Sequence, residues 1–260
     1  MTSPLLEVRE MTKYFGGIHA LKALQFSISK GEIFSIIGPN GAGKSTVFNC
    51  INGIYKPDSG SIFYKGQDIT GWPPHRVAKS GISRTFQNLE LFKYMSTIDN
   101  LLLGRHLKMK STILQVAGLN ILRSKAALEE VSHRAKVEEI IDLLDLQAYR
   151  DYPVFALSYG KQKLVELGRA LAMEPSLLLL DEPAAGLNNE ERQDMIYWIN
   201  DIRDQLEISI IIIEHNMQMV KDISDRVLAL NFGKKIAEGK PEEVLQNQDV
   251  IMAYLGEEIT

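Results

Sequence analysis

The sequence has little cysteine, no long apolar run and no secretory leader, and each absence excludes a class of protein. With one cysteine, Cys50, among 260 residues, no disulfide can form within the chain. No stretch approaches the length of about 18 apolar residues that a membrane-spanning helix needs. The first residues, MTSPLLEVRE, lack a basic segment followed by an apolar one. Together these absences predict a cytoplasmic protein.

The sequence also lacks a strong excess of charge of either sign. Lys and Arg together number 29, and Asp and Glu number 33, which gives a net charge of −4. A broad basic surface for nucleic acid is therefore not expected. Hydrophobic residues make up 45% and charged residues 24%, the proportions of a folded domain, so a disordered chain is excluded. A subunit that works with a separate membrane protein is consistent with all of these limits.

Apolar runs alternate with helical patterns over most of the chain. Leu24, Phe26 and Ile28 alternate with polar residues, which predicts a half-exposed antiparallel strand. Residues 61–69 have the pattern of a hairpin with its turn near Lys65-Gly66. Further predicted elements are buried strands at 33–37, 177–180, 208–213 and 227–230, a helix at 45–53, and a helix with the apolar stripe Met195, Ile199, Ile202 and Leu206. This alternation indicates an α/β fold with a mostly parallel sheet.

The middle of the chain has a different pattern. Residues 96–150 show helical periodicity and no strand-like run. In particular, Val137, Ile140, Ile141 and Leu144 fall on one helical face, opposite charged residues. We therefore expect a helical insertion at 88–164 within a core made of residues 1–87 and 165–260.

A glycine-rich segment, Gly38–Ser45, matches the pattern G-x-x-x-x-G-K-[ST] at every fixed position. Between a buried strand and a helix, the backbone N–H groups of such a loop can surround an anion beside the positive end of the helix. Lys44 supplies an ammonium group for the terminal phosphates, and the Ser45 hydroxyl is an oxygen ligand suited to Mg²⁺. The predicted nucleotide site comprises Gly38, Asn40, Gly41, Ala42, Gly43, Lys44, Ser45 and Thr46.

An acidic pair, Asp181 and Glu182, follows the buried strand at 177–180. Carboxylates at the end of such a strand lie at the sheet edge where ligands bind in folds of this class. We expect Asp181 to hold Mg²⁺ through water, and Glu182 to orient or deprotonate an attacking water. Without the phosphate loop, a strand that ends in solvated carboxylates would explain the pair equally well.

A helix is predicted to start at Leu157-Ser158-Tyr159-Gly160-Lys161. Ser158 and the first N–H groups of this helix could bind a second anion. On local grounds a plain serine N-cap is the better explanation, because a chain with one phosphate loop does not obviously require another anion site.

Five motifs, in order, resemble those of the nucleotide-binding subunits of ATP-binding-cassette (ABC) transporters. They are Gly38–Ser45, Gln87 in Arg84-Thr85-Phe86-Gln87, the signature Leu157–Lys161 followed by Gln162, Asp181-Glu182-Pro183 with the loop Ala185–Asn188, and Glu214-His215. The resemblance covers nearly the whole chain. It implies a phosphate-loop NTPase core with N-terminal antiparallel strands and a helical subdomain, which together form one cassette. It also implies that the cassette hydrolyses ATP, with Mg²⁺, to power transport.

The resemblance gives roles to residues that the local patterns leave open. Two cassettes, as a homodimer or with a paralogue, would face each other head to tail. Ser158 and Gly160 of one cassette would then complete the ATP site built on Lys44 of the other. Gln87 would contact Mg²⁺ and the attacking water, and His215 would contact the γ-phosphate.

Other positions concern the base and the departures from the family pattern. An aromatic residue near the N-terminus stacks on adenine in this family, and Tyr14 and Phe15 are both candidates, of which Phe15 matches the family position better.

Tyr159 replaces a signature glycine and is expected to point away from the phosphate, and Lys161 takes the usual glutamine position. Asn188 stands where many members carry aspartate, so coupling between the two sites is expected to differ in strength.

Within the family, the chain most resembles the ATPase subunits of branched-chain amino-acid importers. The segments that carry this likeness are Gly81–Gln87, Asp181–Asn188, Ile223–Arg226 and the tail Ala253–Gly256. ATPases of urea or amide importers and of lipopolysaccharide exporters share much of the pattern and are alternatives. A soluble cassette ATPase of translation or DNA repair, or a binding module without catalysis, fits less well.

Such a subunit implies partners. They are a second cassette, two transmembrane permease subunits and, indirectly, a solute-binding protein, and they imply a position at the inner face of the cell membrane. Leu89, Leu91, Phe92 and Tyr94 follow Gln87 and are candidates for contact with the permease. Packing inside the helical insertion explains these four residues equally well.

Overall fold

The computed structural model describes residues 3–85, 89–108 and 120–255. The chain forms two compact units, a core unit of Met1–Gln87 with Ser176–Thr260, and a helical unit of Asn88–Pro175. The expected insertion, 88–164, begins where the helical unit begins. Its expected end falls inside helix α6, Tyr159–Leu171, which is one continuous element, so the helical unit extends to Pro175.

The N-terminal part of the core unit forms an antiparallel sheet. Its strand order is β2 (Ile18–Ile28), β1 (Leu6–Phe15), β4 (Ser59–Tyr64) and β5 (Gln67–Asp68). Leu24, Phe26 and Ile28 are buried, as their alternation predicts. Lys65 and Gly66 form the turn between β4 and β5, which confirms the predicted hairpin. A short helix, α2 (Pro74–Ser80), follows this sheet.

The second sheet of the core unit is mostly parallel. Its order is β10 (Lys234–Gly239), β9 (Arg226–Asn231), β3 (Ile33–Ile37), β8 (Ser209–Ile213), β7 (Leu177–Asp181) and β6 (Ile82–Arg84). Strands β3, β7 and β8 are buried along their whole length, so the buried strands predicted from these mostly apolar runs are confirmed. Strand β10 pairs antiparallel to β9, and the other neighbours pair in parallel.

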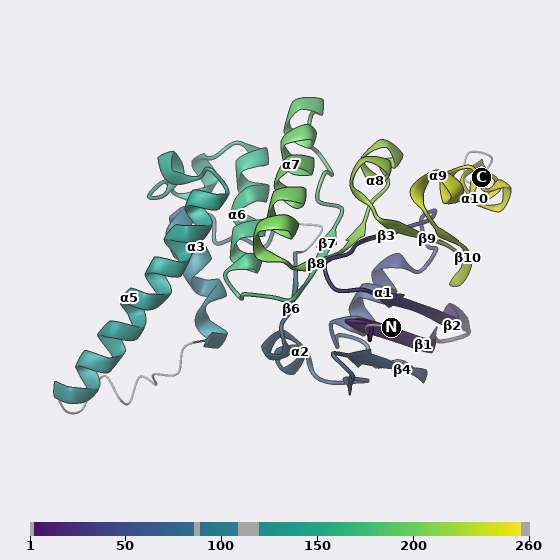
Figure 1. Cartoon of the computed structure of the whole chain (residues 1–260), viewed down its shortest axis with the longest axis horizontal. Coiled ribbons are helices and arrows are strands. Elements are labelled where there is room, and N and C mark those ends of the chain that lie inside the picture. Colours follow the sequence, from purple (N-terminus) through teal and green to yellow (C-terminus); the bar gives the residue numbers. More distant parts are fainter. Residues whose placement is uncertain (1–2, 86–88, 109–119, 256–260) are drawn as a thin grey trace. The chain divides into compact units, whose positions relative to one another are not determined.

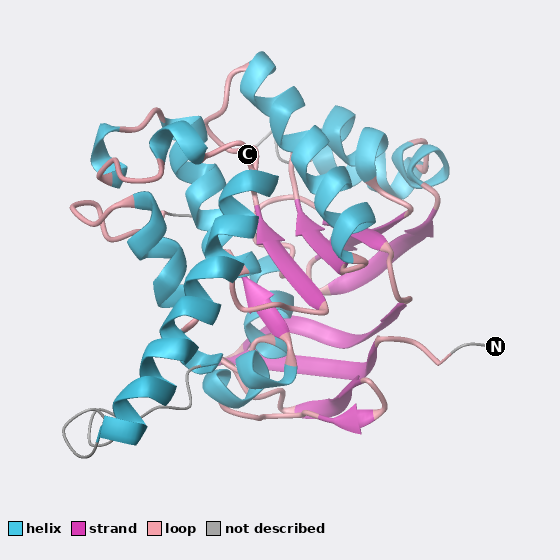
Figure 2. Cartoon of the chain, turned by 60° about the vertical axis from the view of Figure 1, so that its left-hand side comes forward, coloured by secondary structure: helices cyan, strands magenta, loops and turns pink. Residues whose placement is uncertain are grey.

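Helices cover the parallel sheet, and its two faces join different hydrophobic clusters. Phe34 and Ile36 of β3 join the cluster that contains the apolar side of α1 (Lys44–Ile51) and the antiparallel strands. Ile37 joins a cluster with residues of three C-terminal helices, α8 (Met217–Ile223), α9 (Pro241–Leu245) and α10 (Gln248–Leu255). Every strand drawn in Figures 1 and 2 belongs to this core unit.

Helix α7, Asn189–Leu206, connects β7 to β8 in the core unit. Met195, Ile199 and Ile202 are buried, as the predicted stripe requires. Leu206 does not belong to this buried stripe: it is the last residue of the helix and is 43% exposed. Asn188 caps the helix, since its side chain accepts a hydrogen bond from the N–H of Glu191 at 2.9 Å.

The helical unit contains α3 (Thr97–Gly104), α5 (Asn120–Leu143) and α6 (Tyr159–Leu171), with short 3₁₀ turns at His106–Lys108, Gln147–Tyr149 and Val154–Ala156. The predicted apolar face of α5 and the residue after it, Val137, Ile140, Ile141 and Leu144, is buried. Among the helices of the described ranges, none combines the length and apolar character needed to cross a membrane.

Candidate functional site

The loop between β3 and α1 contains the predicted phosphate-binding segment. Gly43 is the N-cap of α1 and has φ of 105°, in the left-handed region that glycine tolerates best. A Cβ at this position would lie 2.6 Å from the carbonyl oxygen of Ala20, so no larger residue fits. The loop therefore turns tightly into the helix. Because glycine has no side chain, position 43 leaves the first N–H groups of α1 uncovered.

Lys44 is held at the centre of this loop. Its side chain is buried, and the Nζ atom donates hydrogen bonds to the carbonyl oxygens of Gly38 and Pro39 at 2.6 and 2.9 Å. The ammonium group is thus fixed against the loop backbone. A charge fixed in this way suits an anion bound by the same loop.

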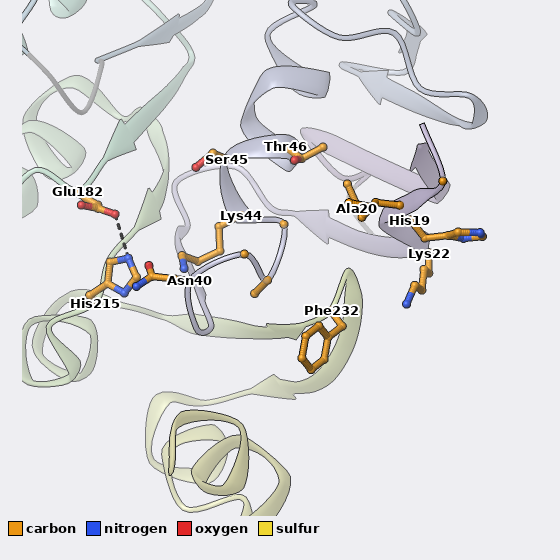
Figure 3. Close-up of a pocket in the computed structure, with 15 residues that line it drawn as sticks. His19, Ala20, Lys22, Asn40, Lys44, Ser45, Thr46, Glu182, His215 and Phe232 are labelled. Carbon is orange, nitrogen blue, oxygen red and sulfur yellow. Dashed lines mark ion pairs between the residues drawn. The ribbon is translucent and has the colours of Figure 1, made fainter. Parts of the chain in front are cut away.

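Glu182 and His215 come together at the ends of two neighbouring parallel strands. Glu182 follows β7 and His215 follows β8, and the two strands pair in register up to Asp181 and Ile213. The Nε2 atom of His215 lies 2.9 Å from Oε1 of Glu182, as the dashed line in Figure 3 marks. Glu182 has φ of 50°, a left-handed backbone conformation that is uncommon for a residue with a side chain.

A buried carboxylate, Glu214, fixes the two loops that carry this pair. Its Oε1 accepts a hydrogen bond from the N–H of Ala184 at 3.0 Å. Its Oε2 accepts from the N–H groups of His215 and Asn216 at 2.9 and 3.1 Å. Because hydrogen bonds to a charged acceptor are strong, Glu214 holds the loop after β7 against the loop after β8. The sequence motif includes Glu214, but its role depends on Ala184, thirty residues earlier in the chain.

Asp181 is engaged by an arginine that sequence reasoning did not single out. The Nη2 atom of Arg84 lies 2.6 Å from Oδ2 of Asp181, and both side chains are buried. The Nη1 atom of Arg84 donates to Oδ1 of Asn49 on α1, also at 2.6 Å. Arg84 therefore connects the acidic end of β7 to the helix that follows the phosphate loop.

A cavity of about 600 Å³ in the core unit brings most of the predicted site residues together. The predicted site residues that line the cavity are Asn40, Gly41, Ala42, Gly43, Lys44, Ser45, Thr46, Glu182 and His215. The same cavity is also lined by Gly17, Ile18, His19, Ala20, Lys22 and Phe232, which were not predicted (Figure 3). Gly38 and Asp181, although both are described, are not among the lining residues.

Tyr14 and Phe15, both described, do not line this cavity either. Each ring is about two-fifths exposed. The ring of Tyr14 packs edge-on against His19, with centroids 4.2 Å apart, and Phe15 packs against Tyr55 at 5.1 Å. The structure therefore places the two aromatic candidates in separate ring pairs near the β1–β2 turn, and does not choose between them.

Other predicted site residues lie in the helical unit or outside the described residues. Ser158 is the N-cap of α6, and its hydroxyl accepts a hydrogen bond from the N–H of Lys161 at 3.4 Å, as local reasoning expects. Gly160 lies in the first turn of the same helix. Tyr159 is 42% exposed, and Lys163 lies over its ring, 5.8 Å from the centroid. Gln87 lies outside the described residues.

A glycine-rich loop between a buried strand and a helix, with an acid and a histidine at adjacent strand ends, defines a phosphate-loop nucleotide-binding protein. Comparison with known protein families agrees with this class, because the family model described as ABC transporter matches residues 21–185. A second, described as branched-chain amino acid ATP-binding cassette transporter, matches residues 234–260. The chain belongs to the ABC transporter family.

Curated relatives match over almost the full length of the chain. The chain is 40% identical to the high-affinity branched-chain amino acid transport ATP-binding protein BraF of Pseudomonas aeruginosa, over 99% of this chain and 100% of that protein. It is 39% identical to LivG, of the same description, from Escherichia coli, again over 99% and 100%. A probable LivG of Archaeoglobus fulgidus is 34% identical over 97% and 95%.

Solved structures confirm the expected fold. A nucleotide-free ATP-binding cassette from an ABC transporter matches with a TM-score of 0.84 and 32% identity, covering 97% of this chain and 99% of that one. The ADP conformation of an ATP-binding cassette of an ABC transporter matches with a TM-score of 0.84 and 31% identity, over 98% and 100%. The α/β cassette fold predicted from the motifs is therefore correct.

Proposed function

We propose that this chain hydrolyses ATP to ADP and phosphate in order to power a membrane importer of branched-chain amino acids. The observation that carries the proposal is the Glu182–His215 pair, 2.9 Å apart, in the same cavity as the phosphate loop. The transported solute is inferred from the names of the relatives in Pseudomonas and Escherichia, which cover the whole chain. The same names favour this solute over urea, amides or lipopolysaccharide.

The cavity supplies the groups that ATP hydrolysis requires. The N–H groups of residues 40–46 and the ammonium of Lys44 bind the phosphates, and His215 contacts the γ-phosphate. Glu182 accepts a proton from, or orients, the water that attacks the γ-phosphate. Since Glu214 joins the loops that carry Glu182 and His215, the two loops keep their places while the phosphate departs.

Magnesium is proposed as the metal that accompanies ATP. The hydroxyl of Ser45 and the carboxylate of Asp181 are oxygen donors of the kind that Mg²⁺ prefers, and such an ion takes its remaining ligands from phosphates and water. Gln87 is a further proposed ligand. When bound, the ion supplies positive charge beside the terminal phosphates. The buried ion pair with Arg84 fixes the direction of the Asp181 carboxylate.

The active form is proposed to contain two cassettes, either two copies or this chain with a paralogue. Ser158 and Gly160 at the start of α6 then contact the phosphates bound to Lys44 of the opposite cassette. Ser158 then has a second role besides capping the helix. Phe15, or alternatively Tyr14, is proposed to stack on adenine.

Two permease subunits and, through them, a solute-binding protein are the proposed membrane partners, which places the chain at the inner face of the membrane. Exposed aromatic rings of the helical unit support this: Phe92 is 56% exposed and Tyr94 is 88% exposed, with Phe155 beside Tyr94 at 5.6 Å between centroids. Packing inside the unit accounts for Leu89 and Leu91, which are half-buried, but not for these rings.

The test of the proposed function is the Glu182→Gln variant. It should bind ATP with magnesium but lose hydrolysis by about 10²–10⁴-fold, and should accumulate as an ATP-bound dimer. Hydrolysis at the parent rate would show that Glu182 does not have this role. Co-purification from membranes tests the transport role. A permease with an amino-acid-binding protein supports it, whereas a lipid-exporting pair of membrane proteins contradicts the proposed solute.

A further inference from the structure

Resting on the proposed function, we propose that Phe232 forms a wall of the nucleoside site and packs its ring against the base of the bound nucleotide. Phe232 lies in the turn between β9 and β10 and lines the same cavity as the phosphate loop. Phe232 lies outside both the phosphate loop, Gly38–Ser45, and the signature, Leu157–Lys161.

The cavity has a catalytic side and an opposite side. Figure 3 shows Glu182 and His215 on one side of Lys44, and Phe232 with Lys22 and His19 on the other. Because hydrolysis takes place at the γ-phosphate, that phosphate must lie beside Glu182. The other phosphates then follow the loop, and the nucleoside extends toward the side where Phe232 lies.

The turn that carries Phe232 is attached directly to the phosphate loop. The N–H of Gly233 donates to the carbonyl oxygen of Ala42 at 3.0 Å, and the N–H of Lys22 donates to the carbonyl oxygen of Gly233 at 2.9 Å. A Cβ at Gly233 would lie 2.5 Å from the carbonyl oxygen of Ala20. The turn, the loop and β2 therefore meet without spare room, and the backbone that carries Phe232 is held in a fixed place relative to the phosphate loop.

The exposure of the ring and the backbone conformation of Phe232 are both unfavourable. The ring is 75% exposed, and the backbone of Phe232 has φ of 45°, which favours glycine or asparagine. A large exposed apolar ring on a strained turn that lines a nucleotide cavity is explained by a contact with the base. Stacking on an aromatic ring is tolerant of base identity, because every base has a π-face and the phenyl ring has no donor or acceptor.

The experiment compares ATP, GTP and inorganic tripolyphosphate, each with magnesium, by calorimetric titration of the full chain. Phe232→Ala should weaken binding of both ATP and GTP by about tenfold, the effect of losing one base–aromatic contact. Tripolyphosphate, which has no base, should bind as it does to the parent chain. Phe232→Tyr should restore the parent affinity for ATP.

Two further variants separate this role from an effect on folding. Phe232→Gly relieves the backbone strain, so it should unfold no more readily than the parent chain, yet lose the same affinity for ATP. Tyr197→Ala removes a ring on α7 that is 59% exposed and is not among the cavity-lining residues, so it should change nothing.

The proposal is overturned if Phe232→Ala binds ATP like the parent, or if it loses ATP and tripolyphosphate affinity together. In the second case the turn supports the loop and does not contact the base. A parent chain that binds no ATP at all would instead contradict the proposed function.

Discussion

The hydroxyl oxygen of Tyr254, in the last helix of the described chain, accepts a hydrogen bond at 2.7 Å from the backbone N–H of Gly38, the first residue of the phosphate loop. The two residues are more than two hundred positions apart. The aromatic ring packs against the cluster that contains Ile37 and Val227. The C-terminal helix α10 therefore supports the loop both through packing and through one polar contact.

Replacing Tyr254 with phenylalanine keeps the ring but leaves the Gly38 N–H without this acceptor. We expect the free energy of unfolding to fall by about 1–3 kcal/mol, the usual effect of leaving a buried donor unpaired. ATP affinity should fall as well, since the loop loses a support. Urea unfolding and ATP titration check the two effects. Equal stability and equal affinity would show that the hydrogen bond is dispensable.

Glu214→Gln should separate catalysis from nucleotide binding. The glutamine side chain keeps one acceptor oxygen but turns an NH₂ group toward a backbone N–H, so the loops after β7 and β8 lose part of their connection. ATP hydrolysis should fall by about 10²-fold through displacement of Glu182 and His215. ATP affinity should stay near that of the parent, because Lys44 is unaffected. Glu190→Gln, at an exposed position on α7, is the control, and a parent rate in Glu214→Gln would refute the positioning role.

Gly233 and Gly31 form a matched pair for testing how tightly the β9–β10 turn is packed. Both have φ of +76°, so alanine introduces the same backbone strain at each position. At Gly31 the new Cβ meets nothing within 4 Å, whereas at Gly233 it lies 2.5 Å from the Ala20 carbonyl oxygen. Gly233→Ala should therefore lower the free energy of unfolding by about 1–3 kcal/mol more than Gly31→Ala. Chemical denaturation of both variants measures the difference, and equal losses would contradict the close approach.

Cys50 should resist alkylation in the folded chain. The thiol is buried in α1, and burial raises its pKa to about 12, so almost no thiolate is present at pH 8. In urea the thiol regains its ordinary pKa and becomes accessible. Iodoacetamide labelling followed by mass spectrometry should therefore track global unfolding. Rapid labelling without denaturant would show that α1 opens locally.

Much of the core was predictable because three of its strands are almost entirely apolar. Strands β3, β7 and β8 are fully buried and apolar except for one residue each, Ser35, Asp181 and Ser209, and such runs are a local signal. Strand β6 has only three residues, and β10, with the sequence KKIAEG, is polar and antiparallel at an edge, so neither shows a periodic pattern. Their positions depend on pairing with β7 and β9.

The same distinction applies to the site. The phosphate loop was predictable because its glycines, lysine and serine are consecutive and each is required by local geometry. Arg84 and Tyr254 were not, because each contacts a partner far away in the sequence. Phe232 was not, because only the folded chain brings its turn to the cavity that the phosphate loop lines. A single exposed phenylalanine or a single arginine carries no signal of this kind before the chain is folded.

The order of strands in the parallel sheet has a consequence for synthesis. Strand β3 lies between β8 and β9, both of which come from the last quarter of the chain. While the ribosome is still making the middle of the protein, this mostly apolar strand has neither of its neighbours and presents two open edges. A nascent or truncated chain that stops before residue 209 is therefore expected to aggregate or to recruit chaperones, even though its first sheet can already form.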